Sequence, residues 1–239
     1  MALIRSGALI RTAARFLRRP RYRWRVLTAW LFRDRLHQTT ELTWVDRYPE
    51  IFARASAELG GKPGARILSF GCSTGEEVIT LRGYFPQAEI VGCEINPRSR
   101  RIARRRTAGT GARLIASANR LIAAHGPYDA IFCLAVLQRT PTLVMASGMD
   151  DISLHYPFGK YEDLLTFLDS CLVPGGLLAI EYSQYRFADA SIAGGYAPLP
   201  GAPVEAEPLC KFAPSGRRIA DAVGEPCLHR KRASQGLLS

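Results

Sequence analysis

The sequence has few of the features that mark membrane-spanning, disulfide-bonded or zinc-binding proteins. No apolar run in the chain approaches the roughly 20 residues that a spanning helix needs. The six cysteines stand far apart, with no C-x-x-C pair and no histidine at ligand spacing. This argues against a disulfide scaffold and against zinc or another metal. We therefore expect a globular protein in a reducing, cytoplasmic compartment.

Acidic residues are scarce in the first 35 residues, where ten arginines accompany a single acid, Asp34. That segment carries most of the net charge of +11, so the rest of the chain is nearly balanced. Residues 1–19 place apolar side chains such as Leu9 and Phe16 on one side of a helix and arginines on the other. Pro20 ends this pattern. The sequence predicts a basic N-terminal helical arm (residues 1–40) ahead of one domain (residues 41–235).

Four interpretations of the arm remain open. A basic amphipathic helix binds an anionic membrane surface, here through residues 1–35 as a peripheral contact. An Arg-rich, acid-poor N-terminus also serves as an organelle transit sequence, and arginines contact nucleic-acid phosphates. The plainest alternative is a helix that packs on the domain and leaves its basic face in water.

The domain is organised around residues 65–81, ARILSFGCSTGEEVITL. An apolar run through Phe70 predicts a buried strand that stops at Gly71. Gly71 and Gly75 allow a sharp turn, and a helix that opens at Glu76 presents free backbone N–H groups to a ligand above the turn. This pattern predicts a cradle for a nucleotide cofactor.

A second apolar run, residues 89–94, ends in Glu94, 19 residues after Gly75. A nucleotide-binding βαβ unit places the acceptor for its ribose hydroxyls there. Asn96 and Pro97 then form an N-cap and first turn for another helix. Further strands are expected at residues 112–116, 128–133 and 177–181, with a helix at 161–172, a loop at 194–208 and a closing strand or hairpin within 219–230.

Four segments, in this order, resemble the successive motifs of class I S-adenosylmethionine (SAM)-dependent methyltransferases: GCSTGEE at 71–77, Glu94, YDAIFCLAVL at 128–137 and LDSCLVPGGLLAIEYSQY at 168–185. The resemblance implies a doubly wound, mostly parallel seven-stranded α/β sheet, the Rossmann-like methyltransferase fold. It also implies SAM as the cofactor and methyl transfer by in-line displacement. Such a reaction needs alignment and exclusion of water more than a nucleophilic side chain.

The resemblance assigns the cofactor site as well. The glycine loop supports the methionine part of SAM, the second-strand acid holds the ribose hydroxyls, and residues after the third and fourth strands flank the adenine. By position the cofactor-binding candidates are Gly71, Cys72, Ser73, Thr74, Gly75, Glu76, Glu94, Ile95, Asn96, Ser117, Ala118, Leu134 and Ala135.

Two positions depart from the family's pattern. Ser69 stands where most members carry an acid, and Ser73 stands where they carry a third glycine. The SAM ammonium group therefore needs another partner, and Glu76 or Glu77 is the candidate.

The acceptor is less clearly indicated. The family's amino-methylating DNA enzymes carry an Asp/Asn-Pro-Pro-Tyr/Phe run after the fourth strand, and the cytosine-carbon enzymes carry a Pro-Cys pair, whereas this chain has LAVL at residues 134–137. Nucleic acid is thus disfavoured, and a small-molecule or lipid-associated acceptor is expected. Residues 140–160 are the expected substrate lid, with His155 as the candidate general base or, alternatively, a purely structural histidine.

Two other functions compete with methyl transfer. A nicotinamide-dependent oxidoreductase uses the same βαβ unit, although the G-C-S-T-G spacing argues against it. The other is a non-catalytic module that keeps the fold and docks a membrane or partner through its Arg-rich arm. The serines at positions 69, 73 and 117 keep this alternative open, because each replaces a common cofactor contact.

Overall fold

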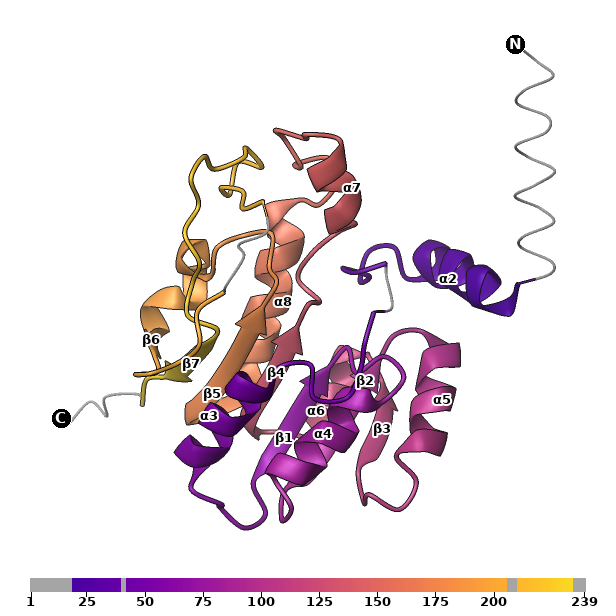
Figure 1. Ribbon diagram of the computed structural model, residues 1–239, viewed down its shortest axis with the longest axis vertical. Coiled ribbons are helices and arrows are strands. Elements are labelled where there is room, and N and C mark those ends of the chain that lie inside the picture. Colours follow the sequence, from indigo (N-terminus) through magenta and orange to yellow (C-terminus); the bar gives the residue numbers. More distant parts are fainter. Residues whose placement is uncertain (1–18, 40–41, 206–209, 234–239) are drawn as a thin grey trace.

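The structure is a computed structural model that describes residues 19–39, 42–205 and 210–233 (Figure 1). The helix expected over residues 1–19 lies almost wholly outside these ranges. In chain order the helices and strands are α2 Pro20–Leu31, α3 Pro49–Leu59, β1 Arg66–Phe70, α4 Glu76–Tyr84, β2 Glu89–Glu94, α5 Pro97–Arg106, β3 Arg113–Ala116, α6 Asn119–Ala124, β4 Tyr128–Leu134, α7 Pro141–Ala146, α8 Phe158–Ser170, β5 Leu172–Glu181, β6 Tyr196–Pro198 and β7 Leu228–Lys231.

One seven-stranded sheet forms the centre of the molecule, in the order β3-β2-β1-β4-β5-β7-β6. Strands β1 to β5 run parallel, and β7 lies antiparallel between β5 and β6. The strand order reverses direction between β1 and β4, which is where open α/β sheets bind ligands at the carboxyl ends of their strands. The predicted doubly wound, mostly parallel fold is confirmed.

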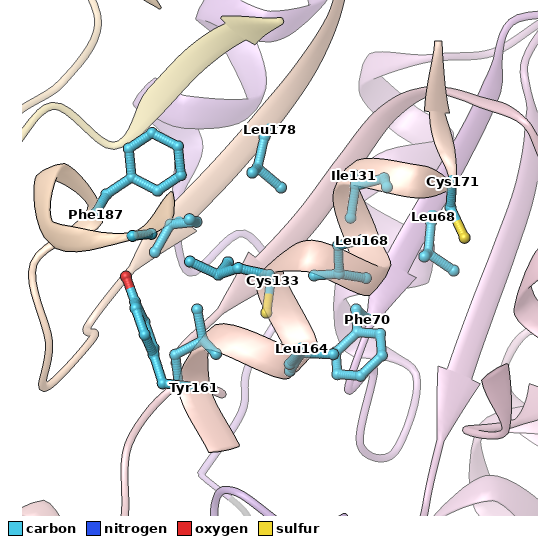
Figure 2. Packing of buried hydrophobic residues seen from close by; sticks show 14 of the residues in the cluster. Leu68, Phe70, Ile131, Cys133, Tyr161, Leu164, Leu168, Cys171, Leu178 and Phe187 are labelled. Atoms are coloured by element: carbon cyan, nitrogen blue, oxygen red, sulfur yellow. The ribbon is translucent and has the colours of Figure 1, made fainter. Parts of the chain in front are cut away.

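Helices cover both faces of the sheet, and successive strand residues alternate between them. Leu68 of β1 packs with α6 and α8 in one core, whereas Ile67 packs with α3, α4 and α5 in the other. Figure 2 shows part of the first core, where Leu164 and Leu168 of α8 lie near Cys133 of β4. Burial on both faces explains why the central strands read as continuous apolar runs.

Two boundaries differ from the sequence-based expectation. β5 begins at Leu172, before the Pro-Gly-Gly turn that was expected to precede it, and its pairing with β4 shifts register across that turn. Gly175 takes a φ of +79° at this irregularity. The loop predicted over residues 194–208 contains β6, a three-residue edge strand too short to leave a periodic pattern.

In the part of the chain that the structure describes, no helix is long and apolar enough to cross a bilayer. All six cysteines are unpaired, and five of them are buried.

A buried ion cluster ties the C-terminal segment to the sheet. The Lys211 ammonium, 1% exposed, donates to the backbone carbonyl of Ser183 at 2.8 Å. It also lies 2.8 Å from the Glu205 carboxylate and 3.7 Å from that of Glu225. Glu225 in turn accepts the backbone N–H of Phe187. The cation therefore compensates the buried Glu205 carboxylate, which would otherwise carry an uncompensated charge, and the partly buried Glu225 carboxylate.

Removing the cation of this cluster should destabilise the fold. We expect Lys211→Met to lower the free energy of unfolding by about 3–5 kcal/mol, because it leaves the Glu205 carboxylate buried and unpaired. Lys62→Met is the matched control, since the Lys62 side chain is 59% exposed in its pair with Asp129. That variant should cost under about 1 kcal/mol. If urea denaturation shows that the two variants lose the same free energy of unfolding, this account of the cluster is wrong.

Candidate functional site

A cleft lies where the carboxyl ends of β1, β2, β3 and β4 meet the segment that follows α2. It encloses about 1080 Å³ of empty space, part of it open to solvent. Figure 1 shows α2 and α7 beyond the same end of the sheet.

Nine of the predicted cofactor-binding residues line this cleft: Gly71, Cys72, Ser73, Glu94, Ile95, Asn96, Ser117, Leu134 and Ala135. They come from the ends of four neighbouring strands, so the sheet topology brings together residues that are spread over 65 positions of the sequence. Thr74, Gly75, Glu76 and Ala118 lie outside its lining, although the sequence places them in the same motifs.

The turn after β1 is fastened to the end of β2. The backbone N–H groups of Gly71 and Cys72 both donate to the carbonyl of Cys93, at 2.9 and 3.0 Å. Ser73 then adopts a φ of +49°, in the left-handed region that favours glycine. This conformation explains why glycine is common at that position in the family, and it shows that serine is accommodated there.

Glu94 is held rigidly at the bottom of the cleft. Its carboxylate accepts the backbone N–H of Ser73 at 2.9 Å and that of Asn96 at 2.6 Å. The Asn96 side chain caps α5 by accepting the N–H groups of Arg98 and Ser99, as the sequence predicts. Glu94 also lines the cleft, so its carboxylate is both fixed by the backbone and placed at the site.

Glu76 and Glu77 turn to different places, because adjacent residues of a helix point about 100° apart. Glu76 is hydrogen-bonded by Thr74 and forms an ion pair with Arg106 of α5, outside the cleft. Glu77 lines the cleft and accepts a 2.6 Å hydrogen bond from the hydroxyl of Ser69. Burial raises the pKa of Glu77 to about 7.

Gly75 serves the packing of α4 on α5. A Cβ atom at this position would lie 3.1 Å from the Cα of Ala103 and 3.2 Å from the Cγ2 of Thr107, and the residue has a φ of +97°. The glycine that the sequence analysis placed under the ligand therefore allows the close approach of two helices.

Arg47 lines the cleft together with the aromatic residues Trp44 and Tyr48 and also contacts the ring of Tyr182. The Arg47 guanidinium lies 4.6 Å from the ring centroid of Trp44, 4.9 Å from that of Tyr48 and 5.7 Å from that of Tyr182. It donates to the carbonyl of Leu42 and lies close enough to Glu77 to oppose the rise in the pKa of that carboxyl. Sequence motifs gave no sign of this cluster.

Helix α2 and the following residues 32–39 also line the cleft, and we call residues 32–39 the strap. The lining residues are Arg25 and Thr28 of α2 and Arg35, Leu36, His37, Gln38 and Thr39 of the strap. The side chains of Arg139 and Lys160 both donate to the carbonyl of Leu36, at 2.8 and 2.9 Å, and Lys160 also donates to that of Arg33. The strap is thereby fixed to the chain that follows β4.

His155, the candidate general base, is not among the residues that line the cleft. Its Nε2 atom lies 2.6 Å from the hydroxyl oxygen of Thr140. Its pKa is lowered, first by burial and then by the positive charge of Arg139. His37 does line the cleft, and the sequence analysis overlooked it because no local pattern distinguishes it.

Three buried hydroxyl groups in the lining have no hydrogen-bond partner among the described residues: those of Thr28, Tyr48 and Ser73. A buried polar group without a partner costs about 1–3 kcal/mol, and a bound ligand would supply the missing bonds. Among the described residues, no three His, Cys, Asp or Glu side chains are grouped as a metal site requires.

Part of the chain is similar to known methyltransferases. Residues 68–178 match a family model described as a methyltransferase domain. A curated relative, the 4-amino-L-phenylalanine/4-methylamino-L-phenylalanine methyltransferase of Streptomyces pristinaespiralis, is 25% identical over 143 residues, or 54% of this chain. The chain spans about half of that relative's length, since the match covers 47% of it.

Two solved structures illustrate the structural likeness. SAM-bound CalS10, an amino pentose methyltransferase from Micromonospora echinaspora, is 22% identical with a TM-score of 0.43, covering 76% of this chain and 64% of its own. TrmN from Thermus thermophilus is 16% identical with a TM-score of 0.45, and the match covers 78% of this chain and 52% of TrmN.

The strand order and the carboxyl-edge cleft define a doubly wound α/β protein with its cleft at the point where the strand order reverses. Residues 68–178, which carry most of the ordered motifs, match a methyltransferase domain, so this part of the chain is similar to the class I SAM-dependent methyltransferases.

The packing role of Gly75 is directly testable. We expect Gly75→Ala to lower the free energy of unfolding by about 2 kcal/mol or more, because the added methyl group overpacks α5 and strains a left-handed backbone. Gly83→Ala is the control within α4, since a Cβ there meets no atom within 4 Å. It should raise stability by up to about 1 kcal/mol. If both variants behave alike in chemical denaturation, the packing explanation is wrong.

Proposed function

We propose that this chain binds SAM in the cleft and transfers its methyl group to a small-molecule acceptor. The observation that carries the proposal is the fixed Glu94 carboxylate beside the β1 turn, with the unpartnered hydroxyl of Ser73 in the same lining. A rigid acceptor and a buried donor suit a polyhydroxylated nucleoside. SAM supplies a methyl carbon activated by an adjacent sulfonium, and the protein supplies alignment and exclusion of water.

The nucleoside end would lie over β2 and β3. Glu94 would accept the ribose hydroxyls, and Ser117, Leu134 and Ala135 would flank the adenine, as the family resemblance implies. Ser117 is a neutral group whose backbone N–H already donates to the carbonyl of Glu94. Recognition of the adenine then depends on apolar walls and backbone groups more than on an acidic side chain.

The amino-acid end would lie between Glu77 and Arg47. Ser69 and Glu77 together replace the strand acid that most family members carry, because the Ser69 hydroxyl holds the Glu77 carboxylate at the end of β1. Glu77 would pair with the SAM ammonium group and Arg47 with the SAM carboxylate. These opposite charges lie on the same wall as the unpartnered Tyr48 hydroxyl.

The acceptor would occupy the remaining space beneath the strap. The curated relative is named for two amino acids, 4-amino-L-phenylalanine and its methylamino form. A small amine- or carboxylate-bearing molecule is therefore the acceptor class with which to begin. Membrane contact through residues 1–35, a cytoplasmic location, the division at residue 40 and the role of His155 as a base stay predictions.

Calorimetric titration with SAM and with S-adenosylhomocysteine (SAH) tests the cofactor. We expect both to bind with micromolar dissociation constants. Glu94→Ala should lose about 1.5–3 kcal/mol, or about tenfold to a hundredfold in affinity. Glu89→Ala, at the exposed opposite end of the same strand, is the control and should bind within about threefold of wild type. Folded protein that binds neither compound would overturn the proposal.

The role of Glu77 predicts a pH dependence of SAM binding. The pKa of Glu77 is raised to about 7, and the protonated carboxyl cannot pair with an ammonium group. The SAM dissociation constant should therefore rise as pH falls below that value, by at most about tenfold per pH unit. Glu77→Gln should bind weakly and lose this dependence. If SAM binding depends on pH equally in wild type and Glu77→Gln, the titrating group is not Glu77.

A further inference from the structure

His37 is a buried histidine of the strap whose ring lines the cleft. It is 6% exposed, and its Nδ1 atom lies 2.7 Å from the hydroxyl oxygen of Tyr156. The backbone carbonyl of Tyr156 accepts the hydroxyl of Tyr185, which follows β5. The predicted cofactor residues come from the ends of β1 to β4, whereas His37 is held against the segments that follow β4 and β5.

The hydrogen bond to Tyr156 determines which ring nitrogen carries the proton. Tyr156 is fully buried, its pKa is raised by burial, and its hydroxyl has no other hydrogen-bond partner among the described residues. If Nδ1 carried the proton, the Tyr156 hydrogen would be buried without an acceptor, at a cost of the order of a lost hydrogen bond. The tyrosine therefore donates to Nδ1, and Nε2 carries the proton.

The surroundings keep this imidazole neutral. Burial, followed by the positive charges of Lys160 and Arg139, lowers the pKa of His37 to about 3. The residue is thus a poor base near neutral pH, but a neutral N–H donor. No described residue accepts a hydrogen bond from Nε2, and the ring lines the cleft, so this donor is available to a ligand.

The charged residues around the cleft determine whether this donor is better suited to an anionic or a cationic ligand. The only acidic side chains that line the cleft are Glu77 and Glu94, on the cofactor side, within the part of the chain that the structure describes. On the strap side are Arg25, Arg35 and the unpartnered hydroxyl of Thr28. The positive charges of Lys160 and Arg139, which disfavour an imidazolium at His37, also disfavour an ammonium group there and favour an anion.

We infer that His37 donates a hydrogen bond from Nε2 to a carboxylate of the methyl acceptor, so that the substrate is a small organic acid held beneath the strap. His37 is then a substrate-binding residue, and Tyr156 is the positioning residue that sets its tautomer. This inference rests on the proposed function, because it takes the other half of the cleft to be filled by SAM.

The tautomer is tested first, by long-range ¹H–¹⁵N NMR of the histidine side chains in protein saturated with SAH. His37→Asn assigns the resonances. We expect His37 to be neutral with a protonated Nε2 from about pH 5 to about pH 8. Tyr156→Phe should let the Nδ1–H form appear while SAH affinity is unchanged. A protonated Nδ1 in the wild type, or titration near the ordinary histidine pKa, would overturn the inference.

The ligand class is tested on the same SAH-saturated protein, with benzoate as the probe and benzamide as its neutral counterpart. Benzoate should shift the His37 Nε2–H signal saturably and bind at least about tenfold more tightly than benzamide, the lower limit for a hydrogen bond to a charged group. His37→Asn keeps a polar group near Tyr156 but loses the Nε2 donor, and it should weaken the binding of benzoate by a similar factor. His37→Gln reaches the Nε2 position and should retain most of the affinity.

Three results would overturn the carboxylate assignment: no binding of benzoate, equally tight binding of benzamide, or a benzoate affinity that is the same in wild type and His37→Asn. Failure of SAH to bind in calorimetry would instead overturn the proposed function. The His37 tautomer can still be read in that case, so the two failures are distinguished.

Discussion

Two backbone hydrogen bonds to the Glu94 carboxylate connect the parts of the molecule that build the cleft. One comes from Ser73 in the turn after β1, and the other from Asn96 at the start of α5. Because β1 and β2 are parallel neighbours, their carboxyl ends meet at one edge, and a single carboxylate reaches both following segments. The acid is thereby oriented before any ligand arrives, so binding requires little reorganisation of the protein.

The strap adds to the lining of the cleft and is held in place by contacts that are distant in sequence. Arg139 and Lys160 donate to strap carbonyls more than 100 positions away. Charged donors to backbone carbonyls are stronger than neutral ones, and these are partly buried. Part of the N-terminal segment, read from composition as a basic arm, therefore contributes a wall of the site.

The sequence predicted the fold wherever local patterns carry the information. Apolar runs ending in glycine or an acid located β1 and β2, and the Asn96 cap located α5. It could not decide between Glu76 and Glu77, because only the orientation of α4 relative to β1 turns one toward the cleft and the other toward Arg106. It missed His37, whose partner Tyr156 lies 119 positions away. Such a pair leaves no periodicity or spacing to detect.

The distribution of charge gives the two halves of the cleft different chemistry. Glu77 and Glu94 face the side where a cationic cofactor would lie, while Arg25 and Arg35 line the strap side with the neutral His37. Displacement at a sulfonium methyl group is accelerated most when the attacking atom is held in line with the breaking bond. A fixed neutral donor can hold the far end of an acceptor in place without taking a proton from the attacking atom. A general base is needed only if the attacking atom must lose a proton. On this view alignment is provided by anchoring an anion at one end of the acceptor, and the attacking atom is left free to face the methyl group.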